Sequence, residues 1–445
     1  MTGRAARAAA ATVLAAVAVL GTGPAALRTV GAVGAVGTVG AQTSGGSEGA
    51  GGSDEAGAPS CDVESPRLVA EAPTAIADLG FDRAWTITRG HGVSVAVVGT
   101  GIAQENAHFP ADAVTSGADV VRAGEPASQD SDGLGTAVAG IIGARGLEGS
   151  GVIGAAPEVT LVPIRVGYGE GGGSDRDTLQ LTVARLAAGI RAAAQDGAQV
   201  IAVPAATTRD SAALRSAVED ATAGGALVVA SAGSSRDIER QAGWDEESGA
   251  ASAGPGAAWY PAAYPEVLAV APVTETGAAA PGAAPGGPWV DVAAPGQNAP
   301  TTFLAALDCI LGADPDPSYA TGYVAAAAAL VAGAFPDAGP QEWSYRLEAT
   351  SAGAVTGTFD ETVGWGVVNP FDALTLYIDG SAPGPTPPAS VAGSRERPTV
   401  PAAEVDLSRV VDPDEAAHER MLWWVMGGLT VVGLLLLLTR RRPAS

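Results

Sequence analysis

Short apolar runs alternate with longer helical patterns through the middle of this 445-residue chain. The short runs are rich in valine and isoleucine, which is typical of strands buried on both faces of a parallel sheet. The predicted strands are 93–99, 159–166, 198–205, 226–233 and 267–273. The longer patterns are rich in alanine and leucine, and they predict helices at 134–144, 176–195, 211–223, 319–334 and 340–349. This alternation predicts an α/β fold in which a mostly parallel sheet is flanked by helices on both faces.

Both ends of the chain carry membrane signals. Residues 1–28 have Arg4 and Arg7 ahead of a short apolar run and then small residues, which is the form of a secretory signal peptide. Residues 421–439 are apolar for long enough to span a bilayer and are followed by arginines, so they predict one C-terminal transmembrane helix. We therefore expect 440–445 to be a cytoplasmic tail and the globular part to lie outside the cell membrane.

Two segments of biased composition frame the globular part. Residues 29–66 are rich in glycine, alanine and serine and predict a flexible segment. Residues 380–420 are rich in proline and predict a linker to the membrane helix. The domain itself is therefore expected at 67–379.

Charge and cysteine content narrow the function classes. The chain has 24 basic against 48 acidic residues, a formal charge of −24, which argues against nucleic acid as a partner. No lysine is present, so a serine–lysine dyad is excluded. Cys61 and Cys309 are the two cysteines, and the sequence leaves open whether they form a disulfide or stay separate thiols. No histidine or cysteine cluster has metal-ligand spacing, and we predict neither a metal site nor a cofactor.

Several motifs come in an order that a known family shares. They are "VAVVGTGI" at the end of the first predicted strand, "DGLGTAVAGIIGARGLEGSGVIGAAPEVTLVPIR", "ALVVASAGSS" and "PSYATGYVAAAAALVAGAFP". In order and approximate spacing the chain resembles the subtilisin-like serine proteases, peptidase family S8. With the signal peptide and tail helix, it is similar to the mycosins, membrane-anchored subtilases associated with type VII secretion. The resemblance implies a subtilisin-like three-layer fold and a place beside a type VII secretion membrane complex.

The resemblance also implies four catalytic positions, and three of them are changed. The aspartate position holds Gly99, the histidine position Leu134 and the oxyanion-hole asparagine position Ser234, while the nucleophile position keeps Ser318. A serine hydroxyl needs an adjacent base to remove its proton and an acid to orient that base. We therefore predict a pseudoprotease.

Two polar residues near this region have alternative interpretations. His108 either supports its own loop or serves as a substitute base for Ser318. The Ser318 hydroxyl either caps the amino terminus of the following helix, which we prefer, or remains a nucleophile. Asp130 and Asp132 are interpreted as a solvated turn, and Leu134 as an apolar side chain that packs in the core.

Three functions follow from these interpretations. The preferred one is a scaffold or peptide-binding component of type VII secretion. The first alternative is a serine endopeptidase in which His108 acts on Ser318. The second is a surface binding module unrelated to secretion, because a fold by itself does not fix a function.

Overall fold

The computed structural model describes residues 61, 67–130, 132–167, 181–234, 237, 257–280, 282–305, 307–353, 355–389 and 430. All of them belong to the compact unit Gly57–Ser445. The predicted signal peptide and most of both biased segments lie outside the described residues, as does the predicted membrane helix except for Thr430. Within the described part of the chain, no helix is both long and apolar enough to cross a membrane.

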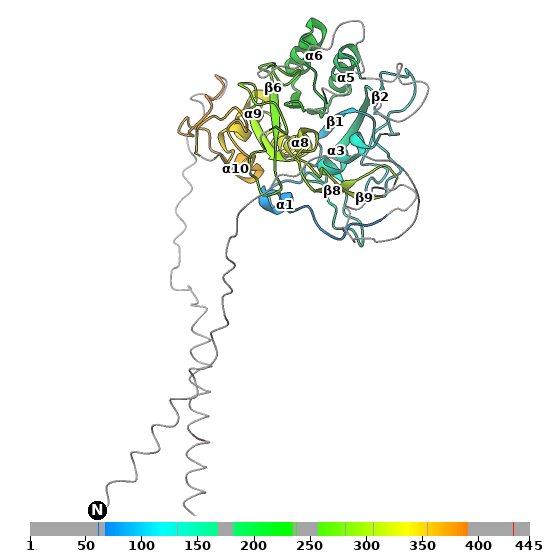
Figure 1. Cartoon of the computed structure of the whole chain (residues 1–445), viewed down its shortest axis with the longest axis horizontal. Coiled ribbons are helices and arrows are strands. Elements are labelled where there is room, and N and C mark those ends of the chain that lie inside the picture. The colour runs from blue at the N-terminus through cyan, green and yellow to red at the C-terminus, as the bar shows by residue number, and fades with distance from the viewer. Residues whose placement is uncertain are drawn as a thin grey trace, which may run out of the picture. The chain divides into compact units, whose positions relative to one another are not determined.

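A seven-stranded sheet forms the centre of the fold, and every pairing in it is parallel (Figure 1). Its strand order is β2-β3-β1-β4-β5-β6-β7. The strands are β1 Ser94–Gly99, β2 Ala118–Asp119, β3 Thr160–Arg165, β4 Val200–Val203, β5 Leu227–Ser231, β6 Val267–Val273 and β7 Val292–Pro295. All five predicted strands are confirmed, and their apolar runs are buried almost throughout.

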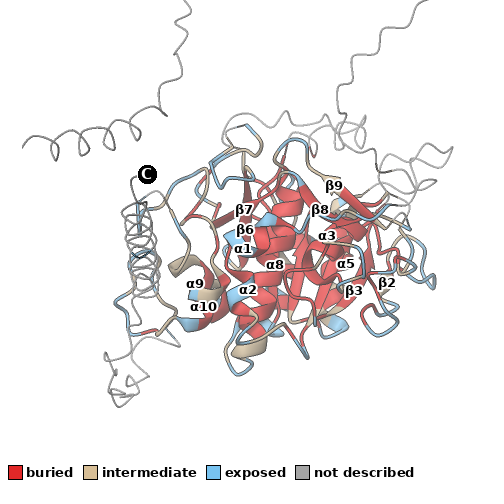
Figure 2. Ribbon diagram, turned by 90° about the horizontal axis from the view of Figure 1, so that it is seen from below, coloured by how far each residue is buried: buried red, intermediate tan, exposed pale blue. Residues whose placement is uncertain are grey.

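Helices cover both faces of this sheet, which confirms the predicted layers (Figure 2). They are α1 Thr74–Asp78, α2 Phe81–Ala84, α3 Leu134–Gly143, α5 Val183–Gln195, α6 Ala212–Ala223, α8 Pro317–Ala334, α9 Pro340–Ala349 and α10 Pro370–Thr375. Helices α3 and α8 share one hydrophobic cluster with one face of the sheet, and α5 and α6 share a second cluster with the other face.

Helix α8 is buried along nearly its whole length. It contacts five neighbouring strands, β1 and β4 to β7. A helix that is apolar on all sides is stable only inside a protein, and here residues 325–329 are five consecutive alanines. Their small side chains allow the helix axis to lie close to the sheet, so the first turn of α8 is held firmly at one edge of it.

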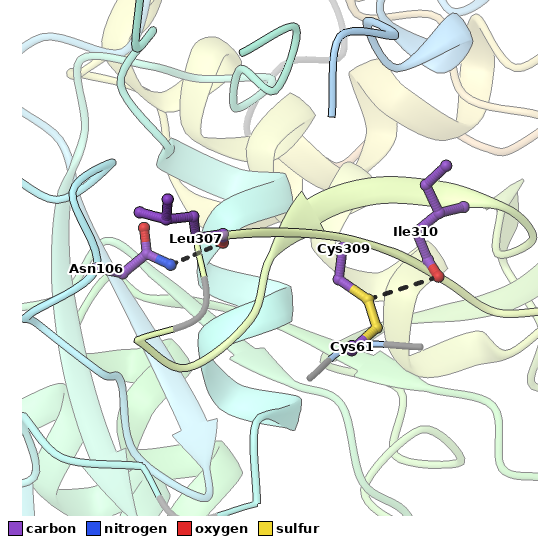
Figure 3. The surroundings of a disulfide bond; sticks show 5 residues. All are labelled: Cys61, Asn106, Leu307, Cys309 and Ile310. Atoms are coloured by element: carbon purple, nitrogen blue, oxygen red, sulfur yellow. Dashed lines mark hydrogen bonds between the residues drawn. A yellow bond between two sulfur atoms is a disulfide. The ribbon is translucent and has the colours of Figure 1, made fainter. Parts of the chain in front are cut away.

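A two-stranded antiparallel hairpin, β8 Ala299–Thr302 and β9 Asp308–Leu311, lies beside α3. The hydroxyl groups of Thr301 and Thr302 donate to carbonyl oxygens in α3, at 2.7 and 2.8 Å. On β9, Cys309 forms a disulfide with Cys61, and the two Cα atoms are 5.6 Å apart (Figure 3). The pairing that the sequence left open is therefore present, and it joins the amino-terminal segment to the hairpin.

The strand order of the sheet reverses at β1. Strand β1 pairs with β3 on one side and with β4 on the other, so the chain changes direction across the sheet there. In open α/β sheets, ligand sites lie at the carboxyl ends of the strands beside such a switch point. Gly99 ends β1, and Pro204 follows directly on β4.

Candidate active site

Ser318 lies in the first turn of α8, at the switch-point edge of the sheet. Its hydroxyl donates a hydrogen bond to the carbonyl oxygen of Pro204, at 2.8 Å, and the residue is only 2% exposed. The capping interpretation of Ser318 was wrong. The cap is Asp316, whose carboxylate accepts from the Ser318 amide at 2.8 Å. The proline at position 317 has the fixed backbone angle that suits the first helical position, so the helix begins two residues earlier than predicted.

Gly99 brings no acid to the site. A Cβ atom built on it would meet Gly135 Cα and Pro204 Cγ at 3.9 Å, which is ordinary van der Waals contact. The following loop is fixed by Thr100, whose hydroxyl oxygen accepts from the Gly135 amide at 2.9 Å. The backbone is therefore anchored beside α3 and has room for a larger side chain, but it carries no carboxylate.

Leu134 is the first residue of α3 and packs, partly buried, against the cluster that contains Val138 and Ile141. The turn before it is more ordered than the predicted solvated turn. The Asp130 carboxylate accepts from the backbone amide of Thr136 at 2.9 Å and from its hydroxyl at 2.8 Å. Asp130 therefore satisfies free amides at the start of α3, which is the role of a cap.

Ser234 follows β5 at the asparagine position and is buried. Its hydroxyl donates to the carboxylate of Asp237 at 2.9 Å, and its amide donates to the same oxygen at 2.9 Å. A hydroxyl held by a carboxylate three residues later is not free to donate to a developing oxyanion. The position therefore lacks the side-chain donor that the oxyanion hole requires.

His108 is completely buried and cannot act on Ser318. Its Nδ1 lies 2.6 Å from the carbonyl oxygen of Arg145, and its Nε2 lies 2.7 Å from Asp308 Oδ1. Both ring nitrogens are therefore engaged with groups other than Ser318, whose hydroxyl is hydrogen-bonded to the Pro204 carbonyl instead. The alternative in which His108 is a substitute base is contradicted for this physical reason.

The partner of His108 was missed by sequence reasoning. Asp308 also accepts from the Ser150 hydroxyl at 2.5 Å and from the Val69 amide at 2.8 Å. Burial raises the pKa of the Asp308 carboxyl, but hydrogen bonds from His108, Ser150 and a backbone amide outweigh burial and hold that pKa below its ordinary value. No local pattern marks this aspartate, because its partners are far away in the sequence.

The hydrogen-bond partner of the Ser318 hydroxyl is a backbone carbonyl. Within the described part of the chain, no imidazole or carboxylate forms a hydrogen bond with the Ser318 hydroxyl. The group that receives its proton in a hydrogen bond is a backbone carbonyl, which is far too weak a base to remove it. Among the described residues, no group of three or more His, Cys, Asp or Glu side chains is placed to hold a metal ion.

Comparisons with known proteins agree with this arrangement of elements. The model of the subtilase family, peptidase S8, matches residues 90–366. Mycosin-3 of Mycobacterium tuberculosis is 31% identical over 406 residues, which cover 82% of this chain and 84% of the relative. The crystal structure of MycP1 from Mycobacterium smegmatis has a TM-score of 0.58 and 29% identity, and the match covers 75% of this chain and 92% of that one.

A further match comes from a structure of an intact ESX-5 inner membrane complex. One chain of it has a TM-score of 0.58 and 26% identity, and the match covers 82% of this chain and 90% of that one. The family model covers more than half of the chain, and Mycosin-3 is matched over most of both lengths. This chain therefore belongs to the subtilase family, and within that family to its mycosin-like members.

Proposed function

We propose that this chain is a catalytically inactive mycosin-like subtilase that works as a scaffold or peptide-binding component of a type VII secretion membrane complex. The observation that carries the proposal is the contact of Ser318. Its hydroxyl donates to the Pro204 carbonyl, where an active subtilase would need a base. Leu134 and Gly99 stand where the base and acid belong, and neither side chain can accept a proton.

The size of the catalytic defect supports inactivity. Removing the serine or the histidine of subtilisin, the measured example of this chemistry, costs about 10⁶-fold in turnover. Removing its oxyanion-hole asparagine alone costs roughly 10²- to 10³-fold. These losses are not additive, but the first by itself leaves only about 10³- to 10⁴-fold catalysis over water.

The proposed association with a type VII secretion membrane complex is supported by two similar solved structures. One similar chain belongs to an intact ESX-5 inner membrane complex. Another, a MycP1 protease with 26% identity and a TM-score of 0.56, is described as an essential component of the ESX-1 type VII secretion system. We extend this association to the present chain, with the domain outside the membrane and residues 421–439 as its anchor.

A fluorophosphonate probe tests the catalytic part of the proposal. Such probes label a serine only when its hydroxyl is activated. We expect no labelling of the full-length protein under conditions that label an active subtilisin to completion. Stoichiometric labelling that disappears in Ser318→Ala would overturn the proposal and restore the endopeptidase alternative.

Co-purification tests the scaffold part. The tagged full-length protein is extracted from its native membranes in mild detergent, and its partners are quantified by mass spectrometry. We expect subunits of the secretion machine at near-stoichiometric amounts. Recovery without any of those subunits would contradict the scaffold role and favour a surface binding module unrelated to secretion.

A further inference from the structure

A polar pocket of about 450 Å³ lies at the amino ends of strands β1 and β3. Ser318 lies at the carboxyl ends of the strands, beside Pro204. Its lining includes Arg89, His91, Asp112, Arg145, Glu158 and Thr160. Thr160 begins β3, and the segment before β1 also contributes to the wall. The eight residues from Gly92 to Gly99 span roughly 20 Å of extended chain, so the pocket is separate from the candidate site around Ser318.

The charges of this pocket differ from those of the whole protein. The chain carries twice as many acidic as basic residues, yet the pocket gathers two arginines and one of the three histidines. One arginine is already neutralised, because Arg89 Nε lies 3.1 Å from a Glu158 carboxylate oxygen. The Arg89 guanidinium also stacks over the Trp85 ring, 4.6 Å from its centroid, which fixes its position.

Arg145 is the pocket arginine that forms no ion pair with a described carboxylate. Its Nη2 donates to the Val159 carbonyl oxygen at 2.9 Å, while its Nη1 is buried and forms no hydrogen bond. No described carboxylate lies within ion-pair distance of its guanidinium. Burial lowers the pKa of Arg145, and the charges of Asp112 and Glu158 offset this only from a distance.

A half-buried guanidinium with an unpaired nitrogen is costly, and an anion beside it lowers that cost. The backbone of Arg145 is also fixed, because its amide donates to the His108 carbonyl at 2.9 Å and its own carbonyl accepts from the His108 ring at 2.6 Å. The side chain therefore extends from a rigid base into the pocket wall. The guanidinium is thereby held in place as a fixed cation that can donate to an oxyanion at the pocket wall.

We propose that this pocket binds a single carboxylate group of a partner protein, with Arg145 as its main contact. Asp112 and Glu158 on the wall limit how much negative charge the pocket can take, so a monoanionic carboxylate fits better than a dianionic phosphate. The volume lies within the range of small-ligand sites, about 300–1,000 Å³, and suits one or two residues of a peptide. The inference does not depend on the loss of catalysis at Ser318.

The test uses the full-length protein in detergent micelles and three fluorescein-labelled hexapeptides. The first has a central glutamate and an amidated carboxyl terminus, the second has glutamine and a free carboxyl terminus, and the third has glutamine and an amidated terminus. Binding is measured by fluorescence anisotropy at low and high salt. The first two peptides separate a side-chain source of the carboxylate from a terminal one.

Two variants and one matched control accompany the peptides. Arg145→Gln removes the proposed contact. Gly146→Phe fills the pocket instead, since a Cβ on this pocket-lining glycine meets no heavy atom within 4 Å and its φ lies outside the left-handed region. Arg215→Gln is the control, because it removes an equal charge from an exposed pair with Asp210 on the other face of the sheet.

We expect at least one carboxylate peptide to bind, with affinity about tenfold lower in Arg145→Gln and in Gly146→Phe and unchanged in Arg215→Gln. Binding should also weaken as salt rises, because the contact is an ion pair close to solvent. Equal binding of the neutral peptide, or no binding of either carboxylate peptide at millimolar concentration, would overturn the proposal. Unchanged affinity in Gly146→Phe would overturn it even if Arg145→Gln failed to fold.

Discussion

The buried carboxylate of Asp308 gives the sharpest test of the structural role assigned to His108. Its two oxygens face three donors, which are His108 Nε2, the Ser150 hydroxyl and the Val69 amide. Asp308→Asn keeps the size of the side chain but replaces one oxygen with an NH₂ group. Whichever way the amide is turned, its NH₂ group faces a donor, so at least one of the three donors loses its acceptor.

The expected loss follows from burial. The His108 and Asp308 side chains are both 0% exposed, and each buried donor left without its acceptor costs about 1–3 kcal/mol of unfolding free energy. The same substitution at Asp210 is the matched control. Asp210 pairs with Arg215 at 2.8 Å, but both side chains are more than 40% exposed, so solvent screens this pair and we expect a smaller loss.

Urea unfolding of the two variants and the parent, followed by tryptophan fluorescence without reductant, measures the difference. The pKa of Asp308 is lowered in the folded state, so its contribution is present at neutral pH and is lost as the pH falls through that pKa. The gap between the parent and Asp308→Asn should therefore narrow in acid. A loss at pH 7 no larger than that of Asp210→Asn would refute the role of this cluster.

Three further predictions concern the proposed catalytic positions, the disulfide and a buried acid. The combined change Gly99→Asp, Leu134→His and Ser234→Asn should restore fluorophosphonate labelling, since position 99 has room for a Cβ atom. If a folded triple variant is still not labelled, something other than the missing side chains prevents catalysis. Cys309→Ser opens a link across 248 residues and should lower the unfolding free energy by up to about 5 kcal/mol in the chain-entropy model; an unchanged urea midpoint would contradict this. Burial raises the pKa of Glu348, so ionisation of this carboxyl disfavours the folded state as the pH rises. Glu348→Gln should therefore increase the unfolding free energy at pH 8 but not at pH 4. An increase of equal size at both pH values would contradict this.

The elements that the sequence predicted well are those with strong local patterns. The strand 267–273 and the helix 340–349 have the predicted bounds, and the strand predicted at 198–205 is the shorter β4. The helix predicted at 176–195 begins at 183 within the described residues. Strands β2, β7, β8 and β9 were missed because runs of two to four residues carry no periodicity and become strands only by pairing.

At the candidate site, the sequence by itself determined which groups are missing. A glycine and a leucine cannot hold or transfer a proton in any fold, so the resemblance that puts Gly99 and Leu134 at the acid and base positions predicts the loss of the ordinary triad. The sequence also predicted a helix at 319–334, directly after Ser318, because a long alanine-rich run is typical of a helix. These conclusions depend only on side-chain chemistry and local patterns.

Only the tertiary structure decided what the remaining polar groups do. Ser318 meets the Pro204 carbonyl across 114 residues, His108 meets Asp308 across 200, and Cys61 meets Cys309 across 248. The pairing of such groups depends on how the strands are ordered in the sheet and where the hairpin lies, and no local pattern encodes that order. The sequence had left Ser318 as either a helix cap or a nucleophile and His108 as either a base or a support of its loop. In the fold, Ser318 is hydrogen-bonded to a backbone carbonyl and His108 to a buried carboxylate.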